Sequence, residues 1–332
     1  MKKIKGNTVV WGVIGAGSVC EKKSAPAMNK IPNSRIKSVM RRNYAKAEDY
    51  ARRHGIENWY DNADHIFNDP EINAVYIATP PDSHLELTIK AAHAGKAVYV
   101  EKPMARTHAE CLAMIEVCEK AGVPLYVSYY RRALPKFLKI KELIEQKVLG
   151  EIRMVNIEIY KPLVTEKISQ LENNWRVDPE IAGGGYFYDL ASHQLDYLDF
   201  LFGPIIHVAG FSTNQAKLYK ADDIVTASFA FGQGIMGKGS WCFTVSKVSE
   251  KETITIVGSE GQMEFSAFGD SPIFLNTIHS GKVELNYIAP EHIAGPLIQT
   301  AVNDLLGTGT CPSTGITGAR TNFVMEKMCN EI

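Results

Sequence analysis

The sequence lacks a surplus of charge of either sign, and it lacks a long apolar run. Its 332 residues include 36 Lys and Arg against 37 Asp and Glu, which gives a formal net charge of −1 at pH 7. Because there is no basic surplus, we expect no sequence-independent binding to nucleic acid. No segment approaches the roughly 20 apolar residues that a membrane-spanning helix needs, so we expect no membrane partner.

Paired cysteines and several catalytic signatures are missing as well. The six cysteines, at positions 20, 111, 118, 242, 311 and 329, form no Cys-x-x-Cys pair. Their scatter argues against a disulfide framework or a zinc site and for reduced thiols in a reducing compartment. Neither Gly-x-Ser-x-Gly nor His-Glu-x-x-His occurs. The segment 232–238 resembles a phosphate-binding loop, but Gly239 stands where that loop needs Ser or Thr.

The N-terminus has one feature of a signal peptide. Lys2, Lys3 and Lys5 precede the apolar run 9–17. That run is brief and rich in glycine, unlike the apolar region of a secretory signal. We therefore expect a cytoplasmic protein.

The first part of the chain alternates between short apolar runs and amphipathic stretches. The pattern predicts strands over 9–14, 35–40, 74–78, 97–100 and 125–128, with helices over 18–29, 45–54, 83–94 and 107–120. Strands separated by helices indicate βαβ units and a parallel sheet. We expect residues 1–128 to form one domain.

After about residue 130 strands predominate. The pattern predicts strands over 151–160, 205–213, 224–231, 234–244, 252–258 and 282–287, with helices over 134–146, 186–202, 293–306 and 315–329. Successive strands with few helices between them indicate an open, mostly antiparallel sheet. We expect residues 129–332 to form a second domain, so that both domains are of the α/β class.

A glycine-rich turn follows the first strand and opens the first helix. Gly15 and Gly17 have the Gly-x-Gly-x-x-small spacing, with Cys20 at the third position. The first glycine permits a tight turn, and the second lets a pyrophosphate approach the backbone of Gly17, Ser18 and Val19. Cysteine is small enough for close helix–strand packing. The turn predicts a Rossmann dinucleotide-binding domain.

The tip of the second strand favours NADP(H) over NAD(H). An acidic residue there would bind a ribose diol, but this chain has Arg41 and Arg42, with Lys46 one helical turn on. Guanidinium groups suit a 2′-phosphate through bidentate hydrogen bonds and stacking on adenine. We expect NADP(H) as the preferred cofactor and NAD(H) as the alternative.

Further motifs follow in a fixed order. They are Ala-Thr-Pro-Pro-Asp-Ser-His at 78–84, Glu101-Lys102-Pro103, Asn174-Trp175-Arg176 and Gly183-Gly184-Gly185-x-x-x-Asp189-x-x-x-His193. With the glycine turn, this set resembles the Gfo/Idh/MocA oxidoreductases over most of the chain. The resemblance implies a nicotinamide held between a Rossmann domain and a substrate-binding and oligomerisation domain. It also implies hydride exchange with sugars, polyols or related compounds, in homodimers or homotetramers.

Three side chains are the predicted catalytic groups. Lys102 follows a parallel strand at the sheet edge where ligands bind, and its cation can stabilise an alkoxide. Asp189 and His193 are four residues apart on a predicted helix, so they share one face. His193 can exchange a proton near neutral pH, and Asp189 can orient the imidazole or bind a substrate hydroxyl. The resemblance implies the same roles.

Other residues are expected beside the cofactor. They are Thr79, Pro80, His84, Glu101, Lys102, Trp175 and Arg176. Arg176 can contact the nicotinamide amide or a substrate oxygen. A metal site from Asp189, His193 and His207 would lack a clear helical partner, so no metal is predicted.

Two other functions stay open beside the oxidoreductase. One is a dinucleotide-binding sensor without turnover, and the other is a different reductase chemistry, such as trans-dihydrodiol oxidation or imine reduction. An acid/base pair is not needed in a sensor. The presence of Lys102, Asp189 and His193 therefore favours an enzyme acting on a carbohydrate-like alcohol or carbonyl.

Overall fold

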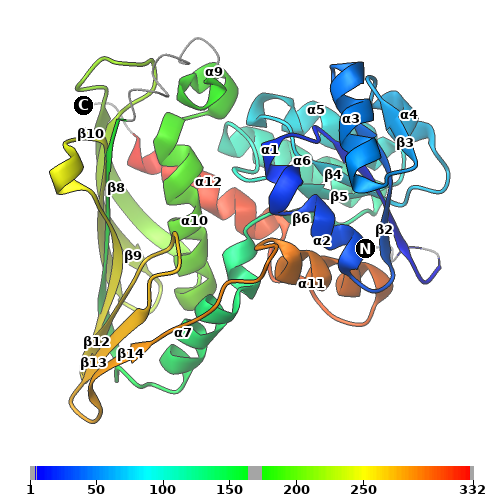
Figure 1. Cartoon of the computed structure of the whole chain (residues 1–332). Helices are drawn as coiled ribbons and strands as arrows, with labels where there is room; N and C mark the ends of the chain where they lie inside the picture. Colours follow the sequence, from blue (N-terminus) through cyan, green and yellow to red (C-terminus); the bar gives the residue numbers. More distant parts are fainter. Residues whose placement is uncertain (1–3, 5, 164–173, 330–332) are drawn as a thin grey trace. The chain divides into compact units, whose positions relative to one another are not determined.

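The computed structural model describes residues 4, 6–163 and 174–329, and the chain divides into two compact units (Figure 1). The first contains Met1–Leu134 and Pro290–Ala319, and the second contains Pro135–Ala289 and Arg320–Ile332. The segment 290–319, expected in the second domain, thus groups with the first unit. Helix α11 (Gly295–Leu306) explains this, because its Leu297 and Ile298 are buried in the core of the first unit.

The first unit is built on a six-stranded parallel sheet. The strands are β1 (Val9–Ile14), β2 (Ser34–Met40), β3 (Asn58–Tyr60), β4 (Ala74–Ile77), β5 (Ala97–Val100) and β6 (Leu125–Val127). Their order is β3-β2-β1-β4-β5-β6, with every neighbouring pair parallel. This order is that of a Rossmann fold and confirms the predicted fold class. The short strand β3 was not predicted, because three half-buried residues carry no periodicity.

Both faces of this sheet are buried. Val9, Trp11 and Val13 join one apolar cluster, and Val10 and Ile14 join another, as the alternation of side chains along a strand requires. The helices of the first unit are α1 (Ser18–Lys22), α2 (Ala25–Lys30), α3 (Tyr44–His54), α4 (Asp64–Asn68), α5 (His84–His93), α6 (His108–Ala121) and α11.

The first helix differs from the prediction, because the expected helix 18–29 is broken into α1 and α2. Pro26 lacks the N–H that would reach the carbonyl of Lys22 four residues earlier. That carbonyl instead lies 2.8 Å from Nδ1 of His292, and the carbonyl of Lys23 accepts from Ala294 N at 3.0 Å. The segment before α11 therefore satisfies the groups that the break leaves.

Gly12, in the middle of β1, offers a test of the packing in the first unit. A Cβ atom at this position would lie 2.3 Å from Cγ2 of the fully buried Ile66. Gly12→Ala should therefore lower the free energy of unfolding by about 1–3 kcal/mol through overpacking, measured by urea denaturation. Gly232→Ala, where nothing lies within 4 Å, is the control. An equal loss in the free energy of unfolding for both variants would contradict the packing argument.

The second unit is built on an eight-stranded mixed sheet. Its strands are β7 (Ile152–Pro162), β8 (Ile205–Thr213), β9 (Ile224–Phe231), β10 (Met236–Val245), β11 (Lys251–Gly258), β12 (Gly261–Phe265), β13 (Ile273–Thr277) and β14 (Gly281–Leu285). The order is β14-β13-β12-β11-β7-β10-β9-β8, and only β7 and β10 pair in parallel. The mostly antiparallel sheet is as predicted. Strands β12 and β13 were not predicted.

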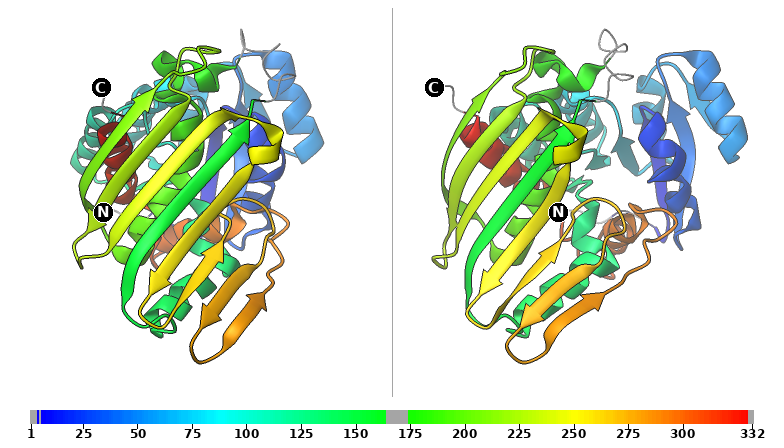
Figure 2. Two further views of the ribbon diagram at one scale, coloured as in Figure 1. Left: turned by 90° about the vertical axis from the view of Figure 1, so that its left-hand side faces the viewer. Right: turned by 60° about the vertical axis from the view of Figure 1, so that its left-hand side comes forward.

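Helices pack against one face of this sheet. They include α7 (Pro135–Glu145), α10 (Gly185–Phe202) and the later part of α12 (Gly315–Met328), and a short α9 (Pro179–Ala182) precedes α10. Among the described residues, no helix crosses the other face (Figure 2). None of the described helices is long and apolar enough to cross a bilayer.

Candidate functional site

The predicted cofactor residues of the first unit lie at one edge of its sheet. In the strand register, Met40 is beside Ile14, Ile14 is beside Ile77, and Ile77 is beside Val100. These four residues end β2, β1, β4 and β5. The loops that begin at 41, 15, 78 and 101 therefore emerge side by side at the carboxyl edge, where open parallel sheets bind their ligands.

The turn after β1 closes tightly against the loop after β4. Gly15 has φ +85°, and a Cβ there would lie 2.7 Å from Cγ2 of Thr79 and 2.9 Å from the backbone of Ala78. Glycine is thus required at this position by the chain's own packing. Cys20, at the third motif position, is fully buried, and burial raises the pKa of its thiol to about 12. It serves helix–strand packing.

The second glycine leaves space instead of filling it. At Gly17 an added Cβ would meet only the carbonyl oxygen of Gly15, at 3.7 Å. Within the described chain, the N–H groups of Ser18 and Val19 at the start of α1 donate to no backbone acceptor. Open space with two available donors fits the approach of a phosphate group to this turn.

Unpaired cations follow β2. Asn43 caps the N-terminus of α3, and its side chain accepts from Lys46 N at 3.0 Å. Further along the same helix, Arg52 and Arg53 pair with neighbouring carboxylates. By contrast, the side chains of Arg41, Arg42 and Lys46 make no ion pair with any residue that the structure describes, and Arg42 and Lys46 are exposed. The end of β2 therefore presents cations without structural partners.

The loop after β4 places Ala78 and Thr79 beside the glycine turn, but it uses His84 differently from the prediction. His84 is fully buried, and its Nε2 and Nδ1 lie 2.8 Å and 3.0 Å from the carbonyl oxygens of Thr79 and Met104. Burial lowers the pKa of this imidazole. Both ring nitrogens of His84 face backbone oxygens, so the side chain links the loops after β4 and β5. Neither nitrogen is then available to a dinucleotide.

The loop after β5 is held by a buried tyrosine. Tyr76 is fully buried and donates to Glu101 Oε1 at 2.5 Å, while Lys102 N donates to Glu101 Oε2 at 3.2 Å. Burial, followed by the charge of Glu101, raises the pKa of Tyr76 well above its usual range. Glu101 thereby anchors the backbone from which the half-buried side chain of Lys102 projects.

In the second unit, three predicted residues are in direct contact. The Arg176 guanidinium lies 4.5 Å from the centre of the Trp175 ring, and its Nε is 3.5 Å from Oδ2 of Asp189. The indole stacking and the carboxylate together orient Arg176. The pairing was not predicted, since residues 176 and 189 come from different elements.

His193 lies one turn after Asp189 on α10. It is 4% exposed, and its ring packs edge-on against Phe268, with ring centres 5.9 Å apart and planes at 77°. Sequence reasoning missed Phe268, since no local pattern links it to α10. Lys102 belongs to the first unit and His193 to the second.

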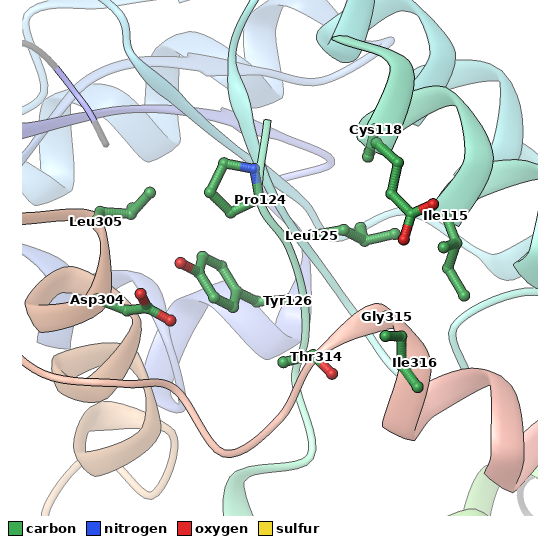
Figure 3. Close-up of a pocket in the computed structure, with 11 residues that line it drawn as sticks. Ile115, Cys118, Pro124, Leu125, Tyr126, Asp304, Leu305, Thr314, Gly315 and Ile316 are labelled. Atoms are coloured by element: carbon green, nitrogen blue, oxygen red, sulfur yellow. The ribbon is translucent and has the colours of Figure 1, made fainter. Parts of the chain in front are cut away.

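A cavity lies at the opposite edge of the first unit's sheet from the glycine turn. It has a volume of about 160 Å³ and is lined by residues of α6, β6, α11 and the start of α12, among them Pro124, Leu125, Tyr126, Asp304 and Gly315 (Figure 3). Pro124 and Leu125 stand at the start of β6, whereas the glycine turn follows the end of β1. The cavity contains none of the predicted site residues. In the described ranges, no three His, Cys, Asp or Glu side chains are grouped to hold a metal ion.

Comparison with known families and proteins gives matches to both halves of the chain. Residues 9–129 match the model of an oxidoreductase family with an NAD-binding Rossmann fold, and residues 137–264 match the Gfo/Idh/MocA C-terminal domain. An oxidoreductase of Formosa agariphila is 38% identical over 320 residues, which span 96% of this chain and 98% of the relative.

More distant relatives have named substrates. The 1,5-anhydro-D-fructose reductase of Ensifer adhaerens is 26% identical over 255 residues, which span 76% of this chain and 74% of the reductase. Among solved structures, levoglucosan dehydrogenase in complex with NADH has a TM-score of 0.86 at 23% identity. That match covers 97% of this chain and 96% of the dehydrogenase, and it supports the observed fold.

Proposed function

The chain belongs to the Gfo/Idh/MocA oxidoreductase family, and we propose that it is an NADP(H)-dependent enzyme for sugars, polyols or related compounds. In this proposal it transfers a hydride between the nicotinamide and a carbonyl or alcohol carbon. The observation that carries the proposal is the carboxyl edge of the first unit's sheet, where the glycine turn lies between the loops at Arg41 and Thr79, and Glu101-Lys102 follows the next strand. The names of two relatives, 1,5-anhydro-D-fructose reductase and levoglucosan dehydrogenase, favour a carbohydrate-like substrate.

The cofactor preference rests on this chain's own residues. Gly15, Gly17, Ser18 and Val19 would hold the pyrophosphate, and the unpaired cations after β2 would hold the 2′-phosphate. Thr79, Pro80, Glu101, Trp175 and Arg176 are proposed to border the rest of the dinucleotide. When bound, the nicotinamide supplies or accepts the hydride.

The preference for NADP(H) can be tested at Arg41. Arg41→Asp should weaken NADPH binding by about 10- to 100-fold, because a hydrogen bond to a charged group contributes about 1.5–3 kcal/mol. NADH binding should change much less, since NADH has no 2′-phosphate. Fluorescence titration of both cofactors measures this, with Arg52→Asp on the same helix as the control. An equal loss for both cofactors would refute the 2′-phosphate assignment.

Two side chains are assigned to the proton and the charge on the reacting oxygen. His193 takes the proton of an alcohol in oxidation and returns it to the oxygen in reduction. The Lys102 ammonium stabilises negative charge on that oxygen. Asp189, paired with Arg176, orients the imidazole or binds a neighbouring substrate hydroxyl.

We further propose a cytoplasmic homodimer or homotetramer. The sheet face without a described helix exposes Phe211, Met236 and Phe274, at 62%, 56% and 47%. The strand pairing directs all three side chains to this one face. Exposed apolar side chains on a single face are typical of an interface between subunits.

A panel assay separates the enzyme from the sensor. Oxidation of NADPH is followed with sugars, anhydro-sugars and keto-polyols, and reduction of NADP⁺ with polyols and a trans-dihydrodiol. We expect turnover with at least one carbohydrate-like compound. Tight NADPH binding without turnover across the panel would favour the sensor, and turnover with the dihydrodiol alone would favour that dehydrogenase activity.

A further inference from the structure

Strand β11 carries a carboxylate on the sheet face that packs against helices. Ile254 and Ile256 are fully buried on this face. Glu252 lies two residues before Ile254 and therefore faces the same way, and in the strand register it is opposite the buried Ile159 on β7. A carboxylate among apolar side chains is costly unless hydrogen bonds satisfy it. Glu252 therefore needs partners.

Among the described residues, Glu252 has four hydrogen-bond partners, which come from α10 and from the loop after β12. Its Oε1 accepts from Gln194 Nε2 at 3.1 Å and from Ala267 N at 3.0 Å. Its Oε2 accepts from Phe268 N at 3.3 Å and from the hydroxyl of Ser266. Gln194 is the residue after His193 on α10, so the carboxylate joins the helix of the predicted base to the loop after β12.

The helix side of this bridge is itself held firmly. Gln194 is fully buried, and its amide oxygen accepts from Trp241 Nε1 at 2.9 Å. The amide can then present only its N–H group to Glu252, so the helix end of the bridge has one orientation.

A buried lysine holds the loop from its other side. Lys136, on α7, is 8% exposed, and its ammonium donates to the carbonyl oxygens of Ser266 at 2.9 Å and Ser271 at 2.7 Å. The loop 266–271 is thus tied to α7 by an ammonium and to β11 by a carboxylate. Charge-assisted hydrogen bonds of this kind are stronger than neutral ones, so the loop holds Phe268 in a defined place.

We propose that Phe268 is a positioning residue that sets the orientation of the His193 imidazole. The Phe268 ring packs edge-on against His193, and Glu252 keeps the loop and α10 in register. The inference rests on the proposed function of His193. Proton transfer depends on sub-ångström placement of the base, so loss of the ring lowers the rate of the chemical step without touching the cofactor.

Phe268→Ala tests the proposal. We expect kcat for the best carbohydrate-like substrate to fall by about 10- to 100-fold, while KM and the Kd for NADPH change less than threefold. Phe268→Tyr, which keeps the ring, should recover most of kcat. Phe323→Ala, which removes an exposed ring on α12, is the control for a general loss of stability. A rise in KM at unchanged kcat would overturn the proposal, because it would make Phe268 a substrate contact.

A double variant shows whether Phe268 acts through His193. In a His193→Ala background, Phe268→Ala should cause no further loss in single-turnover rate. An additional 10-fold loss in that background would overturn the proposal. If the single-turnover rate falls in His193→Ala but not in Phe268→Ala, the result contradicts this inference and leaves the proposed function intact. An unchanged rate in His193→Ala contradicts both the proposed role of His193 and the inference.

The supports of the loop give a second line of evidence. Glu252→Gln and Lys136→Met should each lower kcat, as Phe268→Ala does, and should leave KM unchanged. Lys139→Met, also on α7 but paired with Glu142 near the surface, should leave kcat unchanged. Full activity in well-folded Glu252→Gln would overturn the proposed bridge. Phe268→Ala keeps the loop backbone, so the main test does not depend on the folding of these variants.

Discussion

His193→Ala should lower kcat by roughly 10²- to 10⁴-fold, the range that a positioned general acid or base contributes. Imidazole is the side-chain group that ordinarily serves as a general acid or base near neutral pH. It lies on α10 one turn after Asp189, which pairs with Arg176, and it is buried against Phe268. Removal of the ring should leave NADPH binding intact, since the predicted dinucleotide contacts are other residues.

Steady-state and single-turnover kinetics with the best substrate of the panel measure this effect, and fluorescence titration gives the Kd for NADPH. His279→Ala is a matched control, because His279 is in the same unit, pairs with Glu260 and is largely exposed. If kcat in His193→Ala stays within a few-fold of the unmodified protein, another group transfers the proton.

Lys102→Met is expected to depress the chemical step by about 10²- to 10³-fold, as loss of one group that stabilises a developing oxyanion does. The ammonium projects from a backbone that Glu101 and Tyr76 anchor at the end of β5, so its placement is preorganised. Methionine keeps the apolar stem and removes the charge. The Kd for NADPH should change little, because the phosphate contacts lie after β1 and β2.

Single-turnover rates together with NADPH titration separate the two roles of Lys102. Lys90→Met, a surface change on α5 that breaks the pair with Glu86, provides the baseline for loss of a lysine in the same unit. A large loss of NADPH affinity at a nearly unchanged single-turnover rate would make Lys102 a cofactor contact and not a catalytic one.

Much of the first unit was determined by the sequence itself. Apolar strands alternating with amphipathic helices require a parallel sheet with both faces covered, and the observed order β3-β2-β1-β4-β5-β6 agrees. Because parallel strands end at the same edge, the loops at Gly15, Arg41, Thr79 and Glu101 had to emerge together. Local periodicity and backbone geometry carry this information, so it can be read without knowledge of long-range contacts.

Only the tertiary structure decided which partners the buried polar groups bind. His84 occupies a motif position that was expected to border the cofactor, yet both of its ring nitrogens face backbone carbonyls. The break after α1 follows locally from Pro26, but the partners of the freed carbonyls come from residues 292–294. Partners so distant in sequence follow from packing, which no local pattern encodes.

The position of the predicted base follows from the sequence, whereas its neighbours follow from the fold. The spacing of Asp189 and His193 placed both on one helical face from the sequence alone, since a helix repeats every 3.6 residues. The pairing of Arg176 with Asp189, and the bridge from Glu252 to the loop of Phe268, join residues that adjoin only after the sheet and helices have packed. The partners of Glu252 depended on the assembled fold, because Gln194 lies on a distant helix and Ala267 and Phe268 follow another strand.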